Sequence, residues 1–197
     1  MVSDFGRRLI AVPLAHIAEW LVRLGITPNM LTVAGFGLAM LTAVVLGAGY
    51  LRWGGLLVIF AAFFDTLDGA VAKNTGQTSR FGAFLDSTLD RYSESVIFLG
   101  LAVHYSGSAA TRMELILVFL SIVGSFMVSY ARARAEALNF DCKVGLLQRP
   151  ERIILLALGL LSGWMLVVLS ILAILTNFTA LQRIRAVYVN SKSAPVQ

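Results

Sequence analysis

Residues 65–90 read DTLDGAVAKNTGQTSRFGAFLDSTLD and place four aspartates, Asp65, Asp68, Asp86 and Asp90, between two strongly apolar runs. Charged side chains beside apolar runs of membrane length are costly and mark function. The first two aspartates are three residues apart and the last two are four apart, so each pair projects from one face of a helix. Two such helices side by side would bring four carboxylates into one small volume. Because carboxylates that close cannot all ionise without a shared cation, this stretch predicts a Mg²⁺ or Mn²⁺ site. Any one aspartate alone is equally well explained as a solvated loop residue or a helix cap.

The composition predicts a membrane protein. Of the 197 residues, 58% are hydrophobic and only 14% are charged, which favours one all-α integral membrane domain over a soluble one. The net charge of +5 is not arranged in basic runs with exposed aromatic residues, so we expect no nucleic-acid partner. The single cysteine, Cys142, excludes an internal disulfide.

The chain divides into three parts. Residues 1–25 carry apolar residues at helical spacing, interrupted too often by polar ones for a signal peptide, and predict an amphipathic helix on the membrane surface. Residues 26–189 predict six transmembrane helices that form the catalytic domain, and residues 190–197 predict a disordered tail.

The spans follow from the apolar runs. We expect the first over about 29–50, the second ending in Asp65 and Asp68, the third starting near Gly82 and the fourth within 112–137. Residues 150–189 would be about 60 Å long as one helix, about twice the hydrocarbon thickness, so they predict a hairpin of two spans broken near Ser162 and Gly163. The spacing of Gly159 and Gly163 indicates either close helix packing or, for Gly163, a turn.

Charge sets the expected orientation. With both termini in the cytoplasm, every Lys and Arg except Arg52 and Arg112 lies on the cytoplasmic side, as the positive-inside rule requires of a plasma-membrane protein. The four aspartates then lie at the cytoplasmic ends of the second and third spans. The site should therefore open to the cytoplasm at the inner leaflet of the lipid bilayer.

Written out, the pattern is Asp65-x2-Asp68-Gly69-x2-Ala72-Lys73-x8-Gly82-x3-Asp86-x3-Asp90, and it resembles the CDP-alcohol phosphotransferase (CDP-alcohol phosphatidyltransferase) family. The family has Arg where this chain has Lys73, which keeps the positive charge and loses the bidentate fork. The resemblance implies a CDP-linked lipid donor, CMP as the leaving product and two Mg²⁺ or Mn²⁺ ions. It also implies that Asp65, Asp68 and Asp86 are metal ligands and that Asp90 accepts the proton and shares a metal.

The same resemblance implies residues that bind the donor. Gly69, Lys73 and Ser79 would contact the nucleotide or its pyrophosphate, and Pro28, Asn29 and Thr32 would lie near the donor. For the last three, ordinary helix-start chemistry is an equally good explanation.

Arginines at the cytoplasmic ends of the later spans bear on the acceptor. Each alone indicates a topology or headgroup anchor, whereas together they suit an anionic acceptor. The strings SRFGAFLDSTLDRYSE, SYARARAE, QRPERIILLALG and LQRIRAV are similar to the branch of phosphatidylinositol-phosphate and archaetidylinositol-phosphate synthases. By that analogy Arg132, Arg152 and Arg183 hold the phosphate of inositol 1-phosphate, and the chain forms a homodimer.

Three other interpretations stay open at this point. The acceptor could be glycerol 3-phosphate, as in a phosphatidylglycerophosphate synthase. Acids inside membranes also mark ion pathways, so a divalent-cation carrier is a rival of another class. The aspartates gather towards one side and no chain of polar residues continues across the second and third spans, which argues against transport. The simplest alternative is a purely structural membrane protein.

Overall fold

The computed structural model describes residues 16–76, 78–107 and 111–193, and only the backbone for residues 73–75 and 193. Within these ranges it holds helices and no strands, which confirms the all-α class. The helices are α2 (Pro28–Gly47), α3 (Leu51–Thr75), α4 (Arg80–Ser106), α5 (Arg112–Ala137), α6 (Arg149–Ser162) and α7 (Met165–Ser193). Residues 16–23 form a further helical segment.

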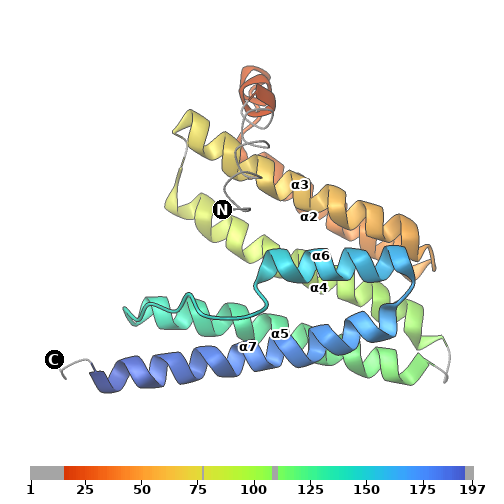
Figure 1. Cartoon of the computed structure of the whole chain (residues 1–197). Coiled ribbons are helices and arrows are strands. Elements are labelled where there is room, and N and C mark those ends of the chain that lie inside the picture. The colour runs from red at the N-terminus through yellow and green to blue at the C-terminus, as the bar shows by residue number, and fades with distance from the viewer. Residues whose placement is uncertain (1–15, 77, 108–110, 194–197) are drawn as a thin grey trace.

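The six labelled helices form a closed ring. Going round it, each helix packs against the next in the order α2, α4, α5, α7, α6, α3 and back to α2, with the most extensive contacts between α2 and α4 and between α5 and α7 (Figure 1). The largest apolar core cluster lies inside this ring and includes Leu46, Phe98, Leu101, Leu160 and Leu169. Consequently α4, α2, α3 and α6 follow one another round the ring, although α5 separates α4 from α6 in the chain.

Four of the described helices are long and apolar enough to cross a membrane: α2, residues Leu51–Ala72 of α3, α5 and residues Met165–Lys192 of α7. Their outer faces expose large apolar side chains such as Val44, Phe119 and Ile174. The chain is therefore a multi-pass membrane protein. Helix α6 has 14 residues and measures only about 21 Å, and α4 carries Asp86 and Asp90 of the acidic stretch.

Helix boundaries follow local chemistry. The side chain of Thr27 caps α2 by accepting a hydrogen bond from the backbone N–H of Met30, and Pro28 is the first residue of the helix, as predicted. Gly163 ends α6 with a φ of +82°, which confirms the turn between α6 and α7. Gly159 serves close packing, because a Cβ there would lie 2.9 Å from side-chain atoms of Val168 on α7.

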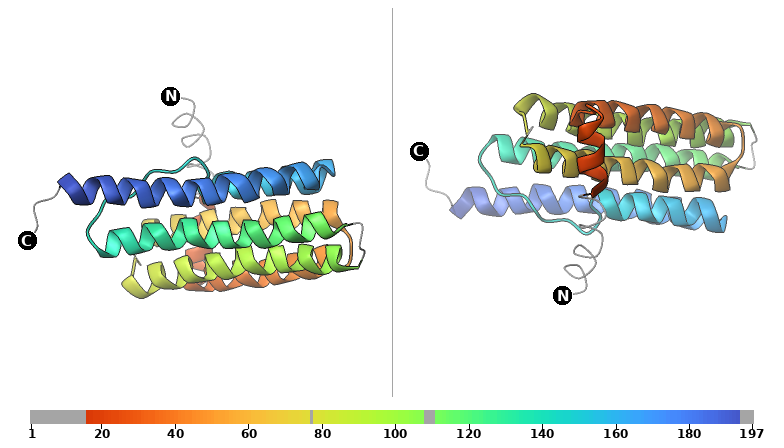
Figure 2. Two further views of the ribbon diagram at one scale, coloured as in Figure 1. Left: turned by 90° about the horizontal axis from the view of Figure 1, so that it is seen from below. Right: turned by 90° about the horizontal axis from the view of Figure 1, so that it is seen from above.

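The two ends of the chain differ in part from the expectation. Residues 190–193, which were expected in a disordered tail, continue α7 to Ser193, because neither Gly nor Pro interrupts the chain between Met165 and Pro195. Residues 194–197 lie outside the described residues, as do residues 1–15 of the expected amphipathic helix. The remainder of that helix crosses the bundle at a steep angle and packs Ala18 against Leu31 and Leu67 (Figure 2).

The contact between α2 and α4 yields a stability test. A Cβ on Gly100 would collide with the backbone of Ala43, lying 2.7 Å from its Cα, whereas a Cβ on Gly37 meets nothing within 4 Å. Gly100→Ala should therefore push α2 and α4 apart and cost about 1–3 kcal/mol, while Gly37→Ala should be neutral or slightly stabilising. Thermal unfolding of both variants in detergent micelles measures this, and equal melting temperatures would contradict the packing.

Candidate metal centre and the pockets beside it

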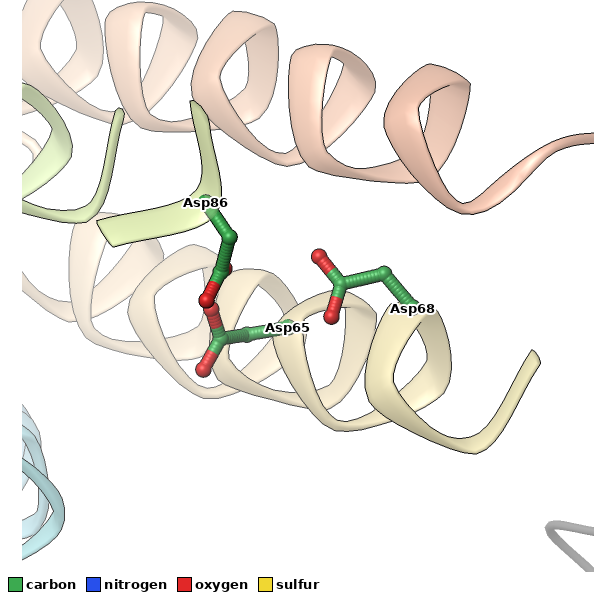
Figure 3. Close-up of side chains that lie close together, drawn as sticks. All are labelled: Asp65, Asp68 and Asp86. Carbon is green, nitrogen blue, oxygen red and sulfur yellow. The ribbon is translucent and has the colours of Figure 1, made fainter. Parts of the chain in front are cut away.

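Three of the four aspartates converge. Asp65 and Asp68 on α3 and Asp86 on α4 each offer a carboxylate oxygen, and these atoms all lie within 4.8 Å of one another (Figure 3). Asp68 is the most buried, with 7% of its surface exposed, and the other two are half-buried. Three hard oxygen donors at this spacing fit one Mg²⁺ or Mn²⁺ ion. The three carboxylates are named the acidic cluster below.

Thr32 fixes one carboxylate of the acidic cluster. Its Oγ1 donates a hydrogen bond of 2.8 Å to Oδ2 of Asp68, 36 residues away, and also lies 3.1 Å from the carbonyl oxygen of Pro28. The Thr32 hydroxyl therefore makes both the contact expected at a helix start, with the carbonyl of Pro28, and the contact with Asp68 at the site. Because metal ligands held by a second hydrogen bond bind more tightly, Thr32 orients Asp68 for a cation.

Asp90 lies one turn further along α4 than Asp86, where its carboxyl group is within hydrogen-bonding reach of Asp65. Its Oδ1 is 2.7 Å from Nη2 of Arg149, whose Nη1 donates a hydrogen bond of 2.7 Å to Oδ2 of Asp65. Arg149 is the first residue of α6 and so links three helices at this point. The four acids therefore form a group of three, with Asp90 joined to Asp65 both directly and through the guanidinium of Arg149.

A pocket of about 150 Å³ lies on one side of the acidic cluster, and we name it the donor-side pocket. Residues Thr32, Asp68, Gly69, Ala72, Thr78, Ser79, Gly82, Ala83 and Asp86 line it. A Cβ on Gly69 would meet no atom within 4 Å, which leaves room for a ligand against the helix. Ser79 caps α4 by accepting a hydrogen bond of 2.9 Å from the N–H of Gly82.

The other residues that were predicted to bind the CDP-linked donor differ in how close they lie to this pocket. Oδ1 of Asn29 is close to Gly82, where a Cβ would approach it to 3.1 Å. Pro28 begins α2 and does not line the pocket. Lys73 belongs to α3, and its side chain lies outside the described part of the chain.

A second pocket, of about 210 Å³, lies on the other side of Asp90, and we name it the basic pocket. Its lining is Asp90, Arg91, Glu94, Val128, Ser129, Arg132, Gln148, Arg149, Pro150, Arg152 and Arg183. The structure thus gathers the three arginines expected to bind phosphate around the aspartate expected to accept a proton. They come from α5, α6 and α7, which are consecutive helices of the chain.

Two of these arginines are held firmly. Arg152, 3% exposed, donates from Nε and Nη2 to the two carboxylate oxygens of Glu94, at 2.7 and 2.9 Å. Arg183, also 3% exposed, donates to the backbone carbonyls of Val144 and Val128. Breaking a buried pair such as Glu94 with Arg152 costs about 3–5 kcal/mol, so this side of the basic pocket is rigid. Arg132 is more exposed and pairs with Glu136 one turn along α5.

Sequence reasoning assigned no role at the site to Glu94, and it counted Arg149 only among the arginines at the ends of the later spans that together suit an anionic acceptor. Glu94 is four residues after Asp90 and therefore lies on the same face of α4. The helical spacing of the sequence could therefore have placed Glu94 at the site. Arg149 directly precedes Pro150 at a predicted helix start beside the site. Its partners, Asp65 and Asp90, depend on helix packing that no local pattern reveals.

Comparisons with known proteins agree with this geometry. Residues 25–182 match the family described as CDP-alcohol phosphatidyltransferase. The chain is 38% identical to an archaetidylinositol phosphate synthase of Pyrococcus horikoshii, over 90% of this chain and 92% of the relative. It is 36% identical to a phosphatidylinositol phosphate synthase of Mycobacteroides abscessus, over 87% and 81% of the two chains.

Solved structures agree as well. The phosphatidylinositol phosphate synthase of Mycobacterium tuberculosis with CDP-DAG bound superposes with a TM-score of 0.84 at 33% identity, covering 89% of this chain and 93% of that one. A crystal structure of the same enzyme with manganese and citrate also gives 0.84, covering 89% and 88%.

The contact between Thr32 and Asp68 predicts an effect on cation binding. Thr32→Val removes the hydroxyl with little change in shape, so Asp68 loses its orienting bond and Mn²⁺ affinity should fall by about tenfold or more. Thr42→Val is the matched control, because the hydroxyl of Thr42 bonds only to the carbonyl of Leu38 in the same helix. Mn²⁺ titration of the purified variants, followed by electron paramagnetic resonance, measures both. Equal losses in the two variants would contradict the role given to Thr32.

Proposed function

The chain belongs to the CDP-alcohol phosphatidyltransferase family, and from this premise we propose that it makes a phosphatidylinositol phosphate or its archaeal ether-lipid counterpart. It transfers the phosphatidyl or archaetidyl group of a CDP-linked lipid to the hydroxyl of inositol 1-phosphate and releases CMP. The observation that carries the proposal is the position of Asp90, at the boundary between the acidic cluster and a pocket lined by Arg132, Arg152 and Arg183.

The donor occupies the donor-side pocket. The open space beside Gly69 admits the pyrophosphate, and the side chains of Ser79, Asn29 and Thr32 border the nucleotide. Lys73, one turn beyond Gly69, adds positive charge. Asp65, Asp68 and Asp86 would hold one divalent cation, and Asp90 would share in holding a second. Two such ions would supply charge neutralisation for the pyrophosphate and the leaving phosphate.

The acceptor occupies the basic pocket, with its phosphate at Arg132, Arg152 and Arg183. Its hydroxyl oxygen attacks the phosphorus that carries the lipid, the bond from that phosphorus to the bridging oxygen of the pyrophosphate breaks, and CMP leaves with the bond electrons. Asp90 takes the hydroxyl proton, since it faces both the basic pocket and the acidic cluster. Rigid guanidinium forks favour an acceptor that carries its own phosphate.

The setting is the inner leaflet of the plasma membrane. We infer that α4 and the short α6 cross the bilayer with the four long apolar helices, giving six spans with both termini and the site on the cytoplasmic side. The distribution of Lys and Arg supports this orientation. The segment before α2 lies on the membrane surface as an amphipathic helix, and the protein works as a homodimer.

CMP release by the purified protein with Mg²⁺ and a CDP-linked lipid tests the function. Release should depend on inositol 1-phosphate over free inositol, glycerol 3-phosphate and serine, and should fall by about 100-fold or more in Asp90→Asn. Asp141→Asn, which alters an exposed carboxylate paired only with Lys143, is the matched control and should keep full activity.

Two outcomes would overturn the proposal. Turnover with glycerol 3-phosphate alone would remove the role of the basic pocket in choosing the acceptor. Flux of Mn²⁺ into vesicles without CMP release under any condition would put a cation carrier in place of the enzyme.

A further inference from the structure

Arg149 takes part in two sites at once. Its guanidinium spans Asp65 and Asp90 with two contacts of 2.7 Å, and the same side chain lines the basic pocket. Asp65 is also a member of the acidic cluster. One guanidinium therefore neutralises a carboxylate expected to hold a cation and the carboxylate expected to accept a proton.

The Arg149 guanidinium occupies the position that a divalent cation bound between Asp65 and Asp90 would take. A divalent ion bridging Asp65 and Asp90 would draw on carboxylate oxygens that now accept from Nη1 and Nη2 of Arg149. Two cations cannot share those oxygens at such distances without strong repulsion. Binding such an ion therefore requires Arg149 to give up at least one of its two carboxylates.

Arg149 differs in its bonding from its neighbours in the basic pocket. Arg152 is committed to Glu94 on two donors, and Arg183 is committed to two backbone carbonyls. Arg149 keeps 28% of its side chain exposed, and its Nε is buried without a hydrogen-bond partner. A guanidinium that has lost a carboxylate at this position would face the space where an acceptor phosphate sits.

We propose that Arg149 is an exchangeable counter-ion that couples the two sites. It neutralises Asp65 and Asp90 while no divalent cation bridges them, and when one binds it turns to the phosphate of the acceptor. This inference rests on the proposed function, because it takes the basic pocket as the acceptor site. By thermodynamic linkage, the cation and the phosphate then tighten each other's binding by the same factor.

The consequence for the reaction is an order of events. Asp90 stays engaged with Arg149 until a cation binds, and the acceptor phosphate then holds Arg149 away, so that Asp90 faces the acceptor hydroxyl. Arg149 acts through Asp90 and is a positioning residue. The alternative is a permanent brace between α3, α4 and α6, which would leave cation and phosphate binding independent.

Mn²⁺ titration of the full-length protein in detergent micelles separates these cases. Free Mn²⁺ is followed by electron paramagnetic resonance with and without inositol 1-phosphate, and no CDP-linked lipid is added, so no turnover occurs. A blank titration corrects for Mn²⁺ bound by inositol 1-phosphate in solution. In the wild type, inositol 1-phosphate should tighten the weaker Mn²⁺ site by about fivefold or more. In Arg149→Gln that site should bind more tightly without phosphate, and the effect of phosphate should vanish.

Arg132→Gln is the matched control. It removes a guanidinium from the basic pocket that contacts Glu136 and none of the four aspartates. It should raise the concentration of inositol 1-phosphate needed and leave the Mn²⁺ affinity without phosphate as in the wild type.

Two results would overturn the inference. One is a Mn²⁺ binding isotherm of the wild type that inositol 1-phosphate does not change. This result does not depend on the folding of any variant. The other is a monodisperse Arg149→Gln protein whose Mn²⁺ affinity and phosphate dependence match the wild type. In both cases CMP release dependent on inositol 1-phosphate would leave the proposed function intact, whereas its absence in the wild type would remove the function itself.

Discussion

The repulsion among carboxylates at one end of an apolar bundle is the constraint on which the site depends. Three carboxylates lie within 4.8 Å of one another, and the fourth is joined to Asp65 directly and through a guanidinium. Such a group is stable only with compensating positive charge and fixed hydrogen bonds. Thr32 from α2 and Arg149 from α6 supply these to acids from α3 and α4. The ring order of the helices makes this meeting possible, because it places all four side by side.

Under the proposed function, the same arrangement separates the donor from the acceptor while keeping their reactive ends close. The donor-side pocket reaches Asp68 and Asp86, and the basic pocket reaches Asp90. Between them Asp65 is shared by the acidic cluster and Arg149. Buried pairs such as Glu94 with Arg152 hold the basic pocket rigid, which suits recognition of a phosphate by fixed donors more than recognition of a flexible neutral alcohol.

Local patterns predicted the local features and missed the distant ones. The spacing of Asp65, Asp68 and Asp86, the helix start at Pro28 and the turn at Gly163 all follow from neighbours in the chain, and the structure contains them. The pairs that complete the site join residues 84, 58 and 36 positions apart: Arg149 with Asp65, Arg152 with Glu94 and Thr32 with Asp68. These depend on the ring order, which hydrophobic periodicity does not encode, because a membrane-spanning helix is apolar on nearly every face.

The central claim is that the lipid product keeps the phosphate of the acceptor, because the basic pocket binds that phosphate and the reaction breaks only the pyrophosphate of the donor. Mass spectrometry of lipids extracted after incubating the purified protein with Mg²⁺, a CDP-linked lipid and deuterated inositol 1-phosphate tests this most directly. The account predicts a deuterated lipid that contains both the inositol ring and its phosphate. A deuterated lipid without that phosphate, or no label in the lipid fraction while CMP is released, would contradict it.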